Sequence, residues 1–133
     1  MNEIAIYPSL KDRVVLITGG ASGIGESIVE QFISQKSKVA FLDINEEQGI
    51  ELTKKIKNKY NVNCLFVKCD LKNITELKSS LEKVKKEIGP ISILVNNAAN
   101  DERHELDSVT PEYWDDRMNI NLRHYFFATQ AVY

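Results

Sequence analysis

The 133-residue chain has few cysteines and histidines, little net charge and no long apolar run. Its two cysteines and two histidines do not stand at the spacing of metal ligands, so we predict no metal site. A formal charge of −2 favours neither nucleic acid nor an anionic membrane surface as a partner. No apolar run is long enough to cross a bilayer, and the first residues lack the basic start and apolar stretch of a signal peptide. We therefore expect one cytoplasmic domain.

Glycine is also scarce, but four of the six glycines fall within residues 19–25. They follow the apolar run Val14-Val15-Leu16-Ile17 and lead into a helical pattern. A strand that ends in a glycine-rich turn and opens a helix brings backbone N–H groups and the positive end of a helix dipole to one point, which suits a phosphate. Gly19, Gly23 and Gly25 are the positions that this role needs. Such turns also arise for purely geometric reasons, so this stretch alone leaves both interpretations open.

Strand-like apolar runs alternate with helical patterns along the rest of the chain. Three further short apolar runs end near Asp43, Cys69 and Val95, and amphipathic patterns separate them. A last helix is predicted from Thr110-Pro111 towards Tyr133. The order is β-α-β-α-β-α-β-α, and runs that are apolar throughout indicate strands covered on both faces. We predict an α/β fold, a Rossmann-like doubly wound parallel sheet in three α/β/α layers, with the ligand at the carboxyl ends of the strands.

Local patterns refine the helices. Asn45 and Thr110 are predicted caps, and Asn73 with Glu76 has the spacing of a capping box. Apolar residues of the first helix are predicted to cover one sheet face, namely Ile24, Ile28, Val29, Phe32 and Ile33. The last helix carries one stripe in which only Asn121 is fully polar, namely Trp114, Met118, Asn121 and Tyr125. Its amide needs partners, so it either ties the helix to neighbouring backbone or holds a catalytic water.

Two acidic residues lie at the carboxyl ends of predicted strands, where we expect the ligand. Asp43 comes 18 residues after Gly25, close to where a dinucleotide fold needs a carboxylate to accept hydrogen bonds from the adenine ribose. Because a carboxylate there would repel a 2′-phosphate, we predict NAD as cofactor and disfavour NADP. Asp70, after the third strand, could accept from the adenine amino group. Each acid could instead cap a helix or complete a turn.

Small and amide side chains follow the fourth strand, at Asn96-Asn97-Ala98-Ala99-Asn100. Small side chains allow a ribose or nicotinamide to pass close to the backbone. The asparagines could instead satisfy backbone groups of their own loop. Both interpretations remain open from the sequence.

Taken in order, these motifs resemble those of the short-chain dehydrogenase/reductases. The resemblance implies NAD(P)-dependent hydride transfer between an alcohol and a carbonyl, and an assembly of two or four copies. Cofactor binding then falls on Gly19, Ser22, Gly23, Ile24, Gly25, Asp43, Asp70, Leu71, Asn97, Ala98 and Ala99. Ala99 stands where the broader family mostly has glycine.

The resemblance also implies a catalytic role for Asn121, as one of four residues. The others would be a serine after the next strand and a Tyr-x-x-x-Lys pair on the helix beyond, and residues 13–133 contain no such pair. Tyr7 and Lys11 have the spacing but precede the first strand. We therefore expect an N-terminal arm over residues 1–12 and, over residues 13–133, the front half of an NAD-binding domain that is inactive alone. The alternatives are a non-catalytic nucleotide-binding fragment or degenerate subunit, and a ketone or acyl reductase.

Within that family, residues 97–104 and Phe41-Leu42-Asp43-Ile44 resemble bacterial NAD-dependent aldose 1-dehydrogenases, including those for D-xylose. These oxidise a cyclic sugar at its anomeric carbon to the lactone. The resemblance implies that polar side chains of the loop bind sugar hydroxyls, namely Asn100, Asp101, Arg103 and His104. The same loop could simply be solvated.

The fourth predicted strand, Ile91 to Val95, is apolar throughout and lies at an edge of the predicted sheet. Exposed apolar edges are normally protected. We therefore predict a homo-oligomer in which this edge and the last helix are buried against another copy.

Overall fold

Four parallel strands form the centre of the structure. The computed structural model describes residues 4–133, and its strands lie in the order β3-β2-β1-β4. Their bounds are β1 Val14–Thr18, β2 Lys38–Asp43, β3 Leu65–Lys68 and β4 Ile93–Val95. Ile17 of β1 pairs with both Phe41 and Val95, so three neighbouring strands end at the same level. This sheet, covered by helices, confirms the predicted Rossmann-like doubly wound fold.

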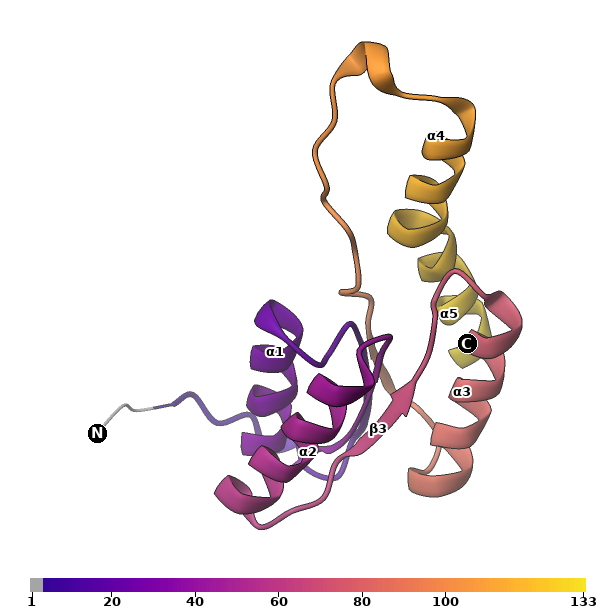
Figure 1. Ribbon diagram of the computed structural model, residues 1–133. Helices are drawn as coiled ribbons and strands as arrows, with labels where there is room; N and C mark the ends of the chain where they lie inside the picture. Colours follow the sequence, from indigo (N-terminus) through magenta and orange to yellow (C-terminus); the bar gives the residue numbers. More distant parts are fainter. Residues whose placement is uncertain (1–3) are drawn as a thin grey trace.

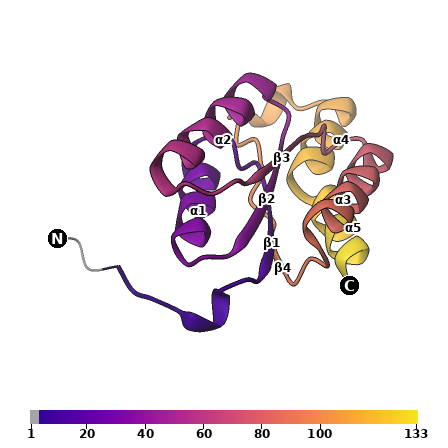
Figure 2. The same cartoon turned by 90° about the horizontal axis from the view of Figure 1, so that it is seen from below.

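The helices cover both faces of the sheet (Figure 1, Figure 2). On one face lie α1 (Gly23–Ser34) and α2 (Glu46–Tyr60), and on the other lie α3 (Ile74–Ile88) and α5 (His124–Val132). Figure 1 shows α4 (Pro111–Met118), with the long loop before it, projecting beyond the sheet. Residues 1–3 of the predicted N-terminal arm lie outside the described residues.

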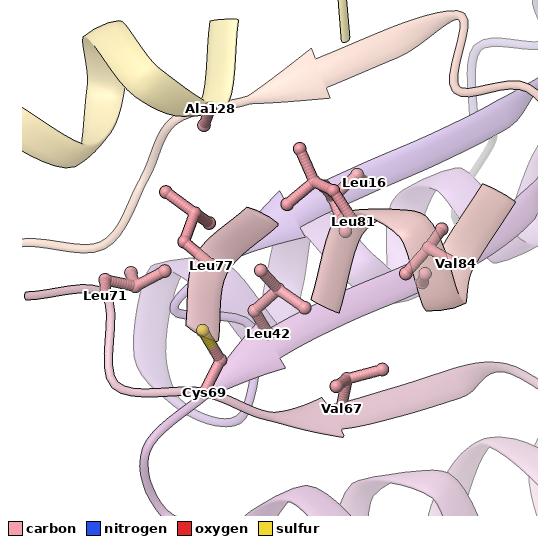
Figure 3. Packing of buried hydrophobic residues seen from close by; sticks show 10 residues of the cluster. Leu16, Leu42, Val67, Cys69, Leu71, Leu77, Leu81, Val84 and Ala128 are labelled. Carbon is pink, nitrogen blue, oxygen red and sulfur yellow. The ribbon is translucent and has the colours of Figure 1, made fainter. Parts of the chain in front are cut away.

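Each face of the sheet buries its own apolar cluster. Leu16 and Leu42 pack towards α3, where Leu81 meets them (Figure 3). Their neighbours in sequence, Ile17 and Phe41, point to the opposite face and pack under α1 and α2. Successive strand residues alternate between the faces. Because both faces are apolar, the strands form continuous apolar runs in the sequence.

The predicted helix caps are confirmed, with one difference. The side-chain oxygens of Asn45 and Thr110 each accept the backbone N–H three residues further on. Asn73 caps α3 in the same way. The capping box is only half formed, however, because Glu76 Oε1 accepts the N–H of Asp70 at 3.0 Å and not that of Asn73. Glu76 thereby ties the loop after β3 to the first turn of α3.

One residue of the predicted apolar face of α1 is misplaced. Val29 and Ile33 are buried as expected, but Ile24 is 76% exposed. The prediction for Ile24 is wrong because α1 begins beyond the carboxyl end of β1, so its first turn overhangs the sheet.

The last predicted helix is interrupted. α4 ends at Met118, a π-helical turn (η3) spans Asn119–Arg123, and α5 begins at His124. Trp114 is 60% exposed and Met118 is also exposed. The predicted stripe is therefore not a core stripe, because α4 projects beyond the sheet that would have covered it.

Within residues 4–133, no helix has the length and apolar character needed to cross a membrane. In the same residues, no three histidine, cysteine or carboxylate side chains gather where they could hold a metal ion. Cys64 and Cys69 are free thiols that pack on opposite faces of the sheet. Burial raises the pKa of each thiol to about 11. Both therefore stay protonated at neutral pH.

Candidate functional site

A cleft opens at the carboxyl ends of the strands. Thirteen predicted site residues line it, namely Gly19, Ser22, Gly23, Ile24, Gly25, Asp43, Asp70, Leu71, Asn97, Ala98, Ala99, Asn100 and Asp101. Residues not assigned to the site from the sequence complete the lining, namely Ile44, Cys69, Lys72, Arg117 and Ile120. The fold therefore gathers residues from the ends of all four strands into one site.

The glycine turn has the geometry of a cradle. Gly19 and Gly23 have φ angles of +66° and +57°, in the left-handed region that glycine adopts without steric cost. Nothing lies within 4 Å of where a Cβ of Gly23 would be, so the backbone there is open to a ligand. A Cβ on Gly25 would instead lie 1.8 Å from the Gly19 carbonyl oxygen. Gly25 is thus required for α1 to begin directly against the turn.

Asp43 faces this turn from the end of β2. One carboxylate oxygen accepts the N–H of Ala21 at 3.0 Å, and the other accepts the N–H of Asn45 at 3.0 Å. The first bond fixes the carboxylate beside the glycine turn, and the second fixes it against the start of α2. Each oxygen retains a further lone pair for a ligand hydroxyl.

Asp70 and Leu71 form the part of the cleft nearest β3. The carboxylate of Asp70 accepts the N–H of Lys72 at 3.0 Å, the turn-forming bond that the sequence left as an alternative. Leu71 is buried in the cluster beneath α3. Asp70 thus shapes its turn and also lines the cleft.

The end of β4 is fastened to the glycine turn through Thr18. Its hydroxyl oxygen accepts the N–H groups of Asn97 and Ala98 at 3.0 and 3.1 Å. The Asn97 amide in turn donates to the carbonyls of Thr18 and Gly19, both at 3.1 Å. Asn97 therefore holds two strand ends together. Thr18 begins the glycine-rich motif in the sequence, but its hydrogen bonds to the end of β4 were not predicted.

The Asn121 side chain ties the π-helical turn to the loop after β4. Its Oδ1 accepts the N–H of Asn100 at 2.7 Å, and its Nδ2 donates to the Asn100 carbonyl at 2.9 Å. Of the two interpretations that the sequence left open, the tie to neighbouring backbone is therefore present. Asn121 does not itself line the cleft, but it positions Asn100, which does.

His124, which the sequence analysis left without a role, is fully buried behind the cleft. Its Nε2 lies 2.7 Å from the Ile120 carbonyl oxygen and 3.1 Å from that of Ala98. Since carbonyls only accept, Nε2 carries the proton and Nδ1 is left as a buried acceptor without a partner among the described residues. Burial lowers the pKa of His124 below 6.5, although the two carbonyls oppose that shift. His124 thus holds Ala98 to the last helix as a neutral imidazole.

This burial predicts a pH dependence of stability. The unfolded state binds the proton near pH 6.5 and the folded state resists it, so the free energy of unfolding falls as the pH drops below 6.5. The loss of stability attributed to His124 therefore develops between about pH 7.5 and 5.5. Urea unfolding of His124→Gln should show a flatter pH profile than that of the wild type. Identical profiles for the wild type and His124→Gln would contradict this role.

Two predicted sugar-binding residues lie apart from the cleft. Arg103 and His104 are exposed on the projecting loop and do not line it. His104 Nδ1 lies 3.2 Å from the Tyr113 hydroxyl, which ties the loop to α4. A role for either residue with substrate stays a prediction.

The residues present fit a dinucleotide. The open backbone at Gly23 leaves room for a pyrophosphate beside the N–H groups that open α1. Asp43 presents a carboxylate one strand away, as ribose hydroxyls require. Arg117 Nε is a buried donor with no partner among the described residues, on the wall of the same cleft. A dinucleotide matches these groups, because its pyrophosphate accepts hydrogen bonds and its ribose hydroxyls donate them.

Residues 13–133 match the family model described as short chain dehydrogenase. The chain belongs to this family. This match confirms the resemblance found in the sequence. The glycine turn, Asp43, Asp70 and Asn97, which carry that resemblance, line the cleft.

Several relatives are named as sugar dehydrogenases. The chain is 47% identical over 128 residues to the D-xylose 1-dehydrogenase of Caulobacter vibrioides, covering 96% of this chain and 50% of that one. The aldohexose dehydrogenase of Thermoplasma acidophilum is 31% identical, with a TM-score of 0.80 over 95% of this chain and 45% of its own. A blue fluorescent protein from a metagenomic library, in complex with NADPH, is 28% identical with a TM-score of 0.86 over 92% of this chain and 51% of its own. The chain spans about half the length of the curated relatives it matches.

Proposed function

We propose that this short-chain dehydrogenase chain provides the NAD-binding half-site for oxidation of an alcohol. The observation that carries the proposal is the carboxylate of Asp43, held beside the glycine turn by the N–H of Ala21 at 3.0 Å. A negative charge fixed there accepts bonds from ribose hydroxyls and repels a 2′-phosphate. NAD is therefore proposed over NADP. The free thiols also suit the reducing cytoplasm, where we place the protein.

Each part of the cleft has its own task in this proposal. The N–H groups at the start of α1 hold the pyrophosphate, and Asp43 orients the adenine ribose. Ala98 and Ala99 leave room for the nicotinamide end along the loop after β4. The nicotinamide, when bound, accepts the hydride. Asn121 acts as a positioning residue, since it holds the loop at Asn100 by two hydrogen bonds.

The proposed substrate is an aldose sugar, oxidised at its anomeric carbon. Two relatives with sugar dehydrogenase names support this choice. Asn100 and Asp101 offer polar side chains where the loop enters the cleft, with Arg103 and His104 further along it. These are suitable partners for sugar hydroxyls.

Turnover by these 133 residues alone is not expected. The sequence from the fourth strand onwards contains no Tyr-x-x-x-Lys pair to act as the base. The purified chain should quench or enhance NADH fluorescence on binding, and should form no NADH from NAD with D-xylose, D-galactose or D-glucose. Turnover with any of them would contradict the proposed inactivity. Binding without turnover is also what the alternative of a non-catalytic nucleotide-binding subunit predicts, and a strong preference for NADPH would favour a ketone or acyl reductase.

The last helix supports the proposal that the chain assembles with copies of itself. Four apolar residues recur at intervals of four and are exposed, namely Trp114, Met118, Leu122 and Phe126. In an α-helix such residues drift by about 40° per step. The wider π-helical turn at Asn119–Arg123 corrects part of that drift, so the four form one stripe. This stripe and the edge of β4 are proposed to pack against another copy.

Light scattering tests this assembly. The wild-type chain is expected to run as a dimer or larger at high concentration, and Leu122→Glu should shift it to a monomer because the stripe would then bury a charge. Ile50→Glu, at a 44% exposed apolar position on α2, is the matched control outside the stripe and should leave the assembly intact. A wild-type chain that stays monomeric at high concentration would contradict the proposal.

A further inference from the structure

Arg117 is the residue of the cleft whose bonding is incomplete. Its guanidinium donates to Asp116, and more weakly to Glu102 at 3.4 Å. Its Nε atom is buried and has no partner among the described residues. A buried donor left unpaired costs about 1–3 kcal/mol. Arg117 lines the cleft and its side chain is 20% exposed, so a ligand is in a position to contact the part of the guanidinium that is not buried.

The place of Arg117 in the cleft follows from the sheet order. Lys72, in the loop after β3, forms an ion pair with Asp116 at 3.0 Å. This contact brings the last turn of α4, and with it Arg117, to the carboxyl end of β3. The glycine turn follows β1, two strands away, which corresponds to about 10 Å at ordinary strand spacing. Arg117 therefore lies on the side of Asp43 remote from the pyrophosphate cradle.

We propose that Arg117 binds the adenine ring of the dinucleotide, with the accessible part of its guanidinium. This assignment rests on the proposed function, because it takes the ligand to run from the glycine turn past Asp43 towards β3. Adenine offers ring-nitrogen acceptors and an aromatic face, and arginine both donates to such acceptors and stacks on such faces. The guanidinium is already held by its hydrogen bond to Asp116. It also lies over the ring of Tyr113, with 5.3 Å between the guanidinium carbon and the ring centre.

NADH fluorescence titrations of four chains test the assignment. Arg117→Met and Arg117→Lys should both raise the Kd for NADH by about tenfold relative to the wild type, because lysine keeps the charge but loses the planar guanidinium. Arg123→Met, an exposed change of the same charge in the π-helical turn that follows α4, should stay within about twofold. An unchanged Kd in Arg117→Met would overturn the assignment. Wild-type affinity restored by Arg117→Lys would also overturn it, since charge alone would then suffice.

The wild-type chain gives a second test that does not depend on a variant folding. Adenosine 5′-monophosphate should shift the NMR signal of the Arg117 Nε–H, and reduced nicotinamide mononucleotide should leave it in place. A shift with the nicotinamide mononucleotide alone would overturn the adenine assignment and leave the nucleotide site standing. A wild-type chain that binds neither NADH nor the monophosphate would contradict the proposed function, and this inference with it.

Discussion

Gly25→Ala is expected to abolish detectable NADH binding and to lower the free energy of unfolding by about 3 kcal/mol. The added Cβ would lie 1.8 Å from the Gly19 carbonyl oxygen and 2.8 Å from the Asn97 amide nitrogen. Neither group can yield easily, because one is backbone and the other holds β4 to β1. α1 must therefore move away from the turn, which displaces the N–H groups proposed to bind the pyrophosphate. Urea unfolding and NADH titration measure the two effects.

Gly49→Ala is the matched control for this prediction. A Cβ at Gly49 would lie 2.4 Å from the Phe66 ring, so this change also crowds a helix against a strand, but outside the cleft. We expect Gly49→Ala to lose stability and to bind NADH as the wild type does while folded. If Gly25→Ala bound NADH with wild-type affinity, the turn would not be the pyrophosphate site.

Asp43→Ala is expected to weaken NADH binding by about 10- to 100-fold and to leave NADPH binding no weaker than in the wild type. Hydrogen bonds to a charged group contribute about 1.5–3 kcal/mol, and tenfold in Kd corresponds to about 1.4 kcal/mol. The variant loses the carboxylate proposed to accept the ribose hydroxyls, and it also loses the charge that would repel a 2′-phosphate. Parallel titrations with the two reduced cofactors measure the change in preference.

The control for charge is Glu47→Ala, an exposed acid in the first turn of α2, close in sequence to Asp43 but absent from the cleft lining. It should leave both affinities within about twofold of the wild type. An Asp43→Ala variant with the wild-type ratio of NADH to NADPH affinity would show that Asp43 does not select the cofactor.

The fold was predictable because its signals are local. Strands covered on both faces give continuous apolar runs, and Asn45 and Thr110 mark helix starts by hydrogen bonds that span three residues. The convergence of Gly19, Asp43 and Asn97 followed from the rule that parallel strands present their carboxyl ends together. These inferences needed no knowledge of tertiary contacts.

What the sequence did not predict depends on contacts between distant segments. The π-helical turn contains Asn121, whose side chain forms two hydrogen bonds with the backbone of Asn100, 21 residues earlier. No pattern in the sequence predicts a contact between residues that far apart. His124 looked isolated because its partners are backbone carbonyls, which carry no side-chain signature. Nothing in the sequence singled out Arg117, because only the fold places it against the cleft. Ile24 was assigned to the core because its helical phase is right, although its end of α1 overhangs the sheet.

The most direct test of the account is to titrate the wild-type chain with NADH and NADPH side by side, at one salt concentration, by fluorescence or calorimetry. The cradle at Gly23 and the carboxylate of Asp43 predict saturable NADH binding at one site per chain and NADPH binding at least about tenfold weaker. Equal or tighter binding of NADPH would contradict the role given to Asp43. Failure of either nucleotide to bind would contradict the site itself.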